Sequence, residues 1–170
     1  MTEKRFSDIT EYLLMFLLAS FIGWLYEIIC VYVVFHTYLD RGVLHIPCCP
    51  IYGFGMLILY FIFRKVKNPI IIFSGSVIIT TAVEYLTAVV LEYRFHKILW
   101  TYSNWPLNFR GRICAISSCL FGIMALLFMK LIVPVLDRIY KSKARNTVSL
   151  SVILIYLCII AWEVHFILQK

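Results

Sequence analysis

Four carboxylates lie within strongly apolar stretches of this sequence: Glu27, Glu84, Glu92 and Glu163. Glu27, Glu84 and Glu163 each lie about fifteen residues from the predicted inner end of their stretch, which is roughly 22 Å along a helix. Such a depth falls in one half of a hydrocarbon core that is about 30 Å thick. A charged side chain at mid-membrane costs roughly 2.5–3.5 kcal/mol on insertion scales, so these residues need a partner or a function. We therefore expect a shared polar site in the outer half of the membrane.

Helical spacing places the acids on faces that are rich in small and hydroxyl residues. One face of the third apolar stretch recurs every four residues: Ser76, Thr80, Glu84, Ala88 and Glu92. Similar faces in the first and fourth stretches consist of Ser20, Gly23 and Glu27, and of Ser118, Gly122 and Ala125. Small residues let helices approach closely and hydrogen-bond across their contact. We expect these faces to pack inward around one polar core.

Basic residues near the predicted outer ends of the stretches are candidate partners for the acids. The resulting cluster contains Glu27, Arg41, Glu84, Glu92, Arg110 and Arg112. In one interpretation, these residues form buried ion pairs that hold the helices in register. In another, they line a path for a substrate, an ion or a proton, because an unpaired buried carboxylate can exchange protons. The residue types leave both interpretations open.

The segment 41–55, RGVLHIPCCPIYGFG, carries four helix-breaking residues near the expected site: Pro47, Pro50, Gly53 and Gly55. It could be an outer hairpin that re-enters the membrane at the mouth of the site, since non-helical backbone at that depth must line a cavity or be buried in protein. The alternative is a plain turn followed by a kinked helix start.

Other kinds of site find little support in the sequence. His45, Cys48 and Cys49 do not follow an established ligand spacing, so we expect no metal. Ser117 and Ser118 lack the elbow motif and the paired base of a hydrolase. No GxxxxGK[ST] or GxGxxG motif occurs, so any ATP hydrolysis requires another chain, and we expect no cofactor. Three cysteines near the predicted outer ends could form a disulfide, a question that their spacing leaves open: Cys48, Cys49 and Cys114.

The composition is that of a membrane protein. Of 170 residues, 62% are hydrophobic and 15% are charged, whereas soluble domains average about 45–50% apolar and about 25% charged residues. The net charge of +7 comes from short basic clusters between apolar runs. Such clusters mark topology and contacts with anionic lipids rather than a surface for nucleic acid. We expect one multi-pass transmembrane domain over residues 1–170.

The apolar stretches predict an all-α, polytopic bundle of about five transmembrane helices: 9–35, 51–63, 70–91, 113–136 and 148–168. The second is short for a span, which needs about 20 residues. Nine or ten Lys and Arg residues would face the side of the N-terminus and six the other side, which favours an N-in, C-out orientation. The connector 92–112 carries Trp100, Tyr102 and Trp105, which suit a membrane interface.

Four strings carry a resemblance to a known family: FIGWLYE (21–27), RGVLHIPCCPIYGFG (41–55), VEYLTAVVLE (83–92) and WTYSNWPLNFRGRIC (100–114). They resemble the ABC-transporter permease family of CmpB type, also called ABC-transporter type IV, over most of residues 21–122. The family usually reads W-D-Y-S where this chain has Thr101 in place of the acid. The family motif, matched onto this chain, includes Pro50, Tyr52 and Gly53 in the hairpin and adds Asn108 to the polar cluster. It also includes five members of that cluster: Glu27, Arg41, Glu84, Arg110 and Arg112.

The resemblance implies a permease-like subunit in the bacterial cytoplasmic membrane, with the bilayer and a separate ATPase subunit as partners and with a homo-oligomer as an open question. Two alternatives come from other classes of protein. The chain could be a membrane scaffold or regulator whose buried charges are structural. It could also be a lipid-acting enzyme that uses Glu84 or Glu92 as a base and Arg110 or Arg112 to bind an anion.

Overall fold

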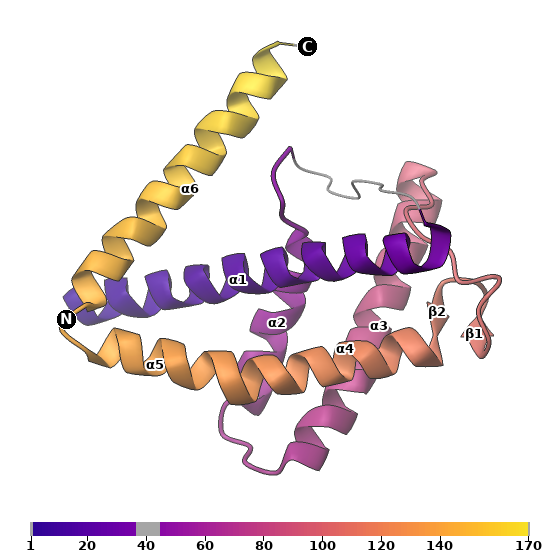
Figure 1. Cartoon of the computed structure of the whole chain (residues 1–170), viewed down its shortest axis with the longest axis horizontal. Helices are drawn as coiled ribbons and strands as arrows, with labels where there is room; N and C mark the ends of the chain where they lie inside the picture. The colour runs from indigo at the N-terminus through magenta and orange to yellow at the C-terminus, as the bar shows by residue number, and fades with distance from the viewer. Residues whose placement is uncertain (1, 37–44, 170) are drawn as a thin grey trace. The chain divides into compact units, whose positions relative to one another are not determined.

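The computed structural model describes residues 2–36 and 45–169, including the side chains of residues 8–32 in the first helix. The described part is mostly helical (Figure 1). Its helices are α1 (Thr2–Phe35), α2 (Pro50–Phe63), α3 (Pro69–Phe95), α4 (Ala115–Leu127), the π-helical segment η1 (Phe128–Ile132), α5 (Val133–Lys141) and α6 (Arg145–Leu168). Strands β1 (Asn108–Phe109) and β2 (Ile113–Cys114) form an antiparallel pair. The predicted all-α membrane fold is confirmed.

Four helices are long and apolar enough to cross a membrane: Asp8–Tyr32, Pro69–Phe95, Ala115–Lys141 and Arg145–Leu168. The 14-residue α2 is shorter than the roughly 17–25 residues of a spanning helix. The fifth span and the N-in, C-out orientation therefore stay predictions. The same holds for the re-entrant hairpin, because residues 37–44, including Arg41, lie outside the described residues.

Local sequence signals explain where two of the spanning helices begin, end or change pitch. The side chain of Asn68 caps α3 by accepting a 2.9 Å hydrogen bond from the Ile70 amide, and Pro69 occupies the first turn. The helix runs past the predicted end at residue 91 and closes at His96, which has a left-handed backbone with φ 52°. The segment η1 precedes Pro134, whose missing N–H interrupts the regular helical hydrogen bonds.

The chain divides into two compact units, of which the first consists of Met1–Leu57 and Ile132–Lys170. Within it, α1 contacts α6 and α5 near its N-terminal end (Figure 1). The buried hydroxyl groups of Thr10 and Ser149 lie 2.8 Å apart, and the Tyr156 hydroxyl donates to the Leu13 carbonyl over 3.0 Å. Most of the α6 surface is exposed and apolar, as expected for a helix that faces lipid.

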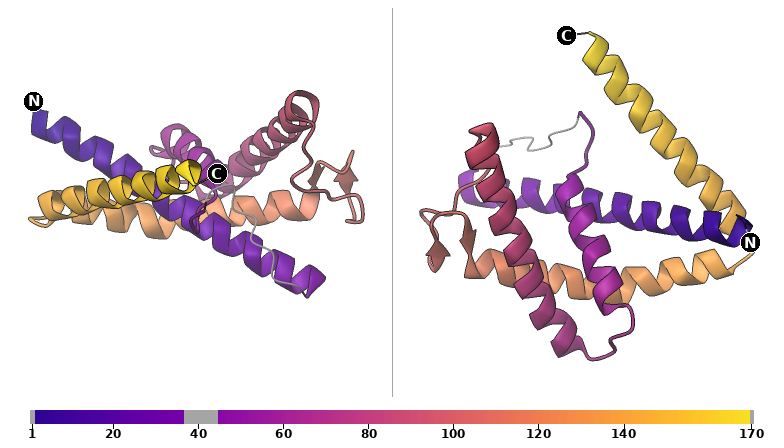
Figure 2. Two further views of the ribbon diagram at one scale, coloured as in Figure 1. Left: turned by 90° about the horizontal axis from the view of Figure 1, so that it is seen from above. Right: turned by 180° about the vertical axis from the view of Figure 1, so that it is seen from behind.

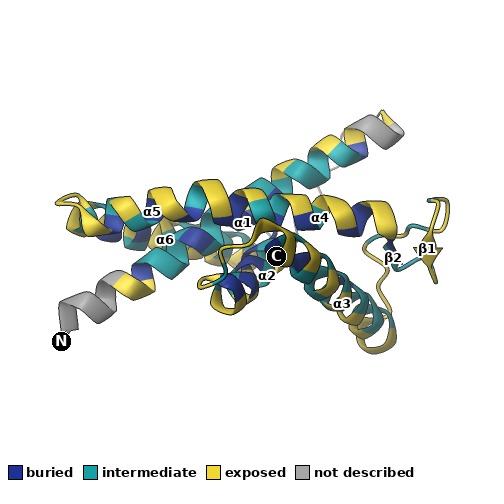
Figure 3. Ribbon diagram, turned by 90° about the horizontal axis from the view of Figure 1, so that it is seen from below, coloured by how far each residue is buried: buried dark blue, intermediate teal, exposed yellow. Residues whose placement is uncertain are grey.

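The second unit, Ile58–Leu131, contains the contact between α3 and α4 (Figure 2). Gly122 lies against Val77 and Phe73, and Thr81 donates a 2.7 Å hydrogen bond to Ser118. Buried and exposed residues alternate along α4, so that one face is covered (Figure 3). The small-residue face predicted for the fourth stretch is thus a helix contact. Whether residues 1–170 form a single domain stays a prediction.

Candidate functional site

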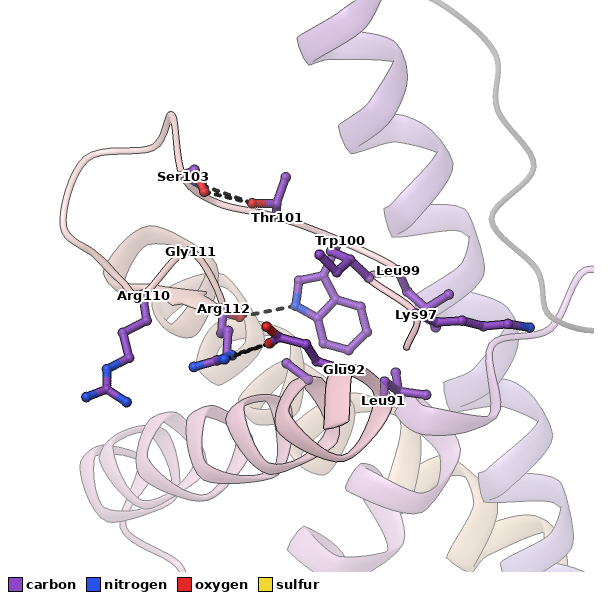
Figure 4. Close-up of a pocket in the computed structure, with 12 residues that line it drawn as sticks. Leu91, Glu92, Lys97, Leu99, Trp100, Thr101, Ser103, Arg110, Gly111 and Arg112 are labelled. Atoms are coloured by element: carbon purple, nitrogen blue, oxygen red, sulfur yellow. Dashed lines mark hydrogen bonds and ion pairs between the residues drawn. The ribbon is translucent and has the colours of Figure 1, made fainter. Parts of the chain in front are cut away.

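The connector after α3 ends in a β-hairpin whose turn is formed by Arg110 and Gly111. Both residues have a positive φ, 54° and 66°, and the Arg112 amide closes the turn on the Phe109 carbonyl over 3.1 Å. A Cβ atom at position 111 would approach the Ser103 hydroxyl to 2.6 Å, so glycine is required there on two grounds. The turn aims the side chains of Arg110 and Arg112 in different directions (Figure 4).

Asn108 organises this turn through its side-chain amide. Its Oδ1 accepts a 3.1 Å hydrogen bond from the Gly111 amide, and its Nδ2 donates to the Trp105 carbonyl over 2.9 Å. The residue therefore shapes the loop from which both arginines extend.

A pocket of about 160 Å³ lies between the end of α3 and this hairpin (Figure 4). On its inner side, the Nε and Nη2 atoms of Arg112 donate to Oε2 of Glu92 over 2.9 and 2.6 Å. The indole Nε1 of Trp100 donates to the Arg112 carbonyl over 3.1 Å, which holds the connector against the hairpin. The hydrogen bond with Glu92 raises the pKa of Arg112 above its usual range, so the guanidinium group stays protonated at neutral pH.

Two further cations line the same pocket. Lys97 and Arg110 are exposed, and their charged ends extend away from the Glu92–Arg112 pair (Figure 4). Arg110 lies over the Phe109 ring, with 5.5 Å from its guanidinium carbon to the ring centre. Among the side chains that the structure describes, neither Lys97 nor Arg110 has a carboxylate partner. The pocket therefore has more positive than negative charge.

Glu84 lies about two turns before Glu92 on α3 and is buried, with 7% of its surface exposed. Its Oε1 accepts a 2.7 Å hydrogen bond from the hydroxyl group of Tyr102. The same hydroxyl lies 2.9 Å from Ser117 Oγ, on the first turn of α4. A carboxylate, a phenol and a serine thus join α3, the connector and α4.

Glu27 in the first unit has a similar partner. The Tyr52 hydroxyl donates to Glu27 Oε1 over 2.6 Å, and the Tyr52 ring lies directly on Gly23. Gly53 and Pro50 begin α2 beside it, and Gly53 packs against Ser20 and Phe16. The predicted face of Ser20, Gly23 and Glu27 is therefore the surface that contacts α2.

Glu163 contacts the segment that leads into α2. Its two carboxylate oxygens lie 2.7 Å from the His45 amide nitrogen and 3.1 Å from His45 Nδ1. The His45 ring stacks on Phe166, with ring centres 4.6 Å apart, and the Trp162 indole donates to the His45 carbonyl over 3.2 Å. These contacts attach the segment to the C-terminal part of α6.

The predicted cluster is divided between the two units. Glu27 belongs to the first, while Glu84, Glu92, Asn108, Arg110 and Arg112 belong to the second. Arg41 lies outside the described residues. A single polar core formed by all of them stays a prediction. Tyr102 is a partner of Glu84, although its position between tryptophans predicts an interfacial aromatic residue. Lys97 and Trp100 also line the pocket and were not among the predicted site residues. Their proximity in sequence to the two arginines was the available signal.

Metal ligands and disulfides can be assessed for the described residues. Within residues 2–36 and 45–169, no group of three or more His, Cys, Asp or Glu residues is placed to hold a metal ion. All six cysteines are free thiols. Burial raises the pKa of the Cys48 thiol.

Comparison with known families shows to which family this chain belongs. The model of the family described as "Putative ABC-transporter type IV" matches residues 14–166. The chain belongs to this family. The match extends over α2, α3, the connector, α4 and α5, and over most of α1 and α6, and so includes every residue of the candidate site. No match was found among curated proteins or solved structures.

Proposed function

We propose that this chain is the membrane-spanning, permease-like subunit of a transporter whose ATPase is a separate chain. Membership of an ABC-transporter family and four helices that are long enough to cross a membrane support the proposal. The sequence has no nucleotide-binding motif, and we therefore assign the ATPase to another polypeptide. In this arrangement α2 completes a fifth span, the N-terminus lies inside a bacterial cytoplasmic membrane, and the C-terminus lies outside.

The observation that carries the functional part is the pocket between α3 and the hairpin. It joins a carboxylate and three cations with an aromatic ring, which is a combination that can bind and orient an anionic group. We assign substrate recognition to this pocket, with Arg112 held by Glu92, and with Lys97 and Arg110 at its rim. Glu27 and Glu84 complete the proposed polar cluster, and Asn108 shapes its loop.

Purification of the tagged chain from its native membranes in a mild detergent tests the pairing with an ATPase. We expect mass spectrometry to find a stoichiometric ATPase, and ATP hydrolysis in the complex to be stimulated by an extract of the source cells. Arg112→Gln should lower this stimulation, whereas Arg94→Gln, which removes an exposed charge near the end of α3, should not. A chain that purifies alone or as a homo-oligomer, with no ATPase, would overturn the proposal.

A structural role is the second candidate, and a specific observation favours it. Glu27 and Glu84 each accept a hydrogen bond from a tyrosine of another segment, so both acids hold chain segments together. If the chain is a scaffold, substitutions that remove the charge of Glu27 or Glu84 but preserve folding should leave the set of co-purifying proteins unchanged. Loss of extract-stimulated ATP hydrolysis in folded Arg112→Gln would instead favour the transporter.

A further inference from the structure

The size of the pocket limits what it can hold. Its volume is about 160 Å³. Pockets for whole drug-sized ligands measure about 300–1,000 Å³. Only a small group, such as a phosphate with a few neighbouring atoms, fits inside. The remainder of any larger ligand must lie on the surface around the pocket.

The charge of the pocket favours a phosphate over a carboxylate. Lys97, Arg110 and Arg112 contribute three positive charges and Glu92 one negative charge, which leaves a formal charge of +2. A phosphomonoester carries about −1.5 to −2 at neutral pH, and its oxygens accept several charge-assisted hydrogen bonds. Lys97 and Arg110 have long, exposed side chains that change rotamer on the picosecond-to-nanosecond timescale, so both can turn toward a bound anion.

The surface around the pocket is apolar although it is exposed. On the connector, Ile98 is 74% exposed and Leu99 is 46% exposed, and on the hairpin side Leu107 and Phe109 are 80% and 53% exposed. Leu91 and Ala88 of α3 continue the apolar lining into the spanning helix. A cationic pocket with such an apolar border is suited to the membrane interface, where one part of a ligand is polar and the other is not.

We propose that this pocket binds the headgroup of an amphiphile that ends in a phosphomonoester, with its apolar tail lying along the exposed surface of α3 and the connector. The inference rests on the proposed function in that it concerns the same pocket, and it names the class of substrate. Arg112 supplies the fixed donor set because Glu92 and Trp100 orient it, and Lys97 and Arg110 close over the phosphate from either side.

Native mass spectrometry of the chain in phosphatidylcholine nanodiscs that contain dioleoyl phosphatidic acid tests this proposal. We expect one tightly bound phosphatidic acid per chain. The variant Lys97→Gln/Arg110→Gln should lower the affinity at least tenfold. The matched control Arg64→Gln/Lys65→Gln removes the same charge from the segment between α2 and α3, at the opposite end of α3 from the pocket, and should change the affinity less than twofold.

Three results would overturn the proposal. Equal losses in both double variants would indicate general attraction to a basic surface. Equal binding of phosphatidylglycerol, a phosphodiester, would show that the pocket does not recognise a phosphomonoester. Displacement of the lipid by equimolar inorganic phosphate would identify a site for a free anion.

A second measurement uses the unmodified chain, so that it does not depend on folding of the variant. A photoactivatable phosphatidic acid should label the peptide 97–112, and labelling only elsewhere would count against the site. These assays need no ATPase. An ATPase that co-purifies while phosphatidic acid fails to bind would leave the proposed function standing and remove the assignment of the substrate class.

Discussion

The hydroxyl group of Tyr102 donates a 2.7 Å hydrogen bond to Glu84 and lies 2.9 Å from Ser117. One side chain from an irregular connector therefore contacts a carboxylate in the middle of α3 and the first turn of α4. The pocket lined by Glu92 and Arg112 is built from two of these segments, α3 and the connector. The position of the connector, and with it the pocket, depends on this contact.

Tyr102→Phe removes the hydroxyl and should lower the free energy of unfolding by about 1–3 kcal/mol, because a buried carboxylate loses a donor. Tyr93→Phe is the matched control, since Tyr93 is 69% exposed on α3, and it should have little effect. Thermal unfolding in detergent measures both. A double-mutant cycle with Glu84→Gln should show that the two residues are coupled; purely additive effects would contradict the contact.

Gly23→Ala should destabilise the protein by about 1–3 kcal/mol, because the added Cβ would overlap the base of the Tyr52 ring. Gly55→Ala provides the control on α2, since nothing lies within 4 Å of a Cβ there. That variant should be neutral or stabilised by up to about 1 kcal/mol through helix propensity. Equal effects of the two substitutions in a denaturation experiment would disprove the predicted close approach of α1 and α2.

Reversal of either charge in the Glu92–Arg112 pair should lower the melting temperature. The charged groups of the native pair lie 2.6 Å apart, so a single reversal places two like charges next to each other in a partly buried position. The double variant Glu92→Arg/Arg112→Glu should recover most of the loss. Arg94→Glu, an exposed reversal two residues away, serves as the control for changed net charge. If the double variant is no better than the sum of the single ones, the two residues do not act as a pair.

Alkylation of Cys48 should be slow at neutral pH, and its rate should increase with pH over a higher pH range than the rate for an exposed cysteine. A raised pKa means that less of the thiol is the reactive thiolate at neutral pH, so the rate should keep rising at higher pH than for an exposed cysteine. The assay compares a variant that retains only Cys48 with one whose only cysteine comes from Ser142→Cys, in the exposed turn before α6. Matching pH profiles of the two variants in maleimide labelling would show that Cys48 is accessible and unperturbed.

Much of the fold could be predicted because helical membrane segments are encoded locally. Apolar runs located the helix ends to within five residues, apart from the start of α1, which lies seven residues before the predicted one. The recurrence of Ser118 and Gly122 at helical spacing identified the face of α4 that contacts α3. The end of α3 was predicted four residues too early because Glu92 and Arg94 interrupt the apolar run, although the charged residues continue the helix to Phe95.

The partner of each acid could not be predicted in the same way. The sequence suggested buried ion pairs between carboxylates and arginines without fixing the partners, and the structure has a partly exposed pair between Glu92 and Arg112. Glu84 and Glu27 accept hydrogen bonds from Tyr102 and Tyr52 instead. A tyrosine next to tryptophans resembles an interfacial aromatic residue, so composition alone does not distinguish the two roles.

The sequence by itself determined that this chain is a helical membrane protein and which small-residue faces its helices use, because hydrophobic length and a period of 3.6 residues are local properties. Only the tertiary structure decided how the connector folds back. Three left-handed residues, Leu107, Arg110 and Gly111, set its direction. They bring Arg112 to a glutamate twenty positions earlier and thereby create a pocket, a relationship between distant segments that no local pattern encodes.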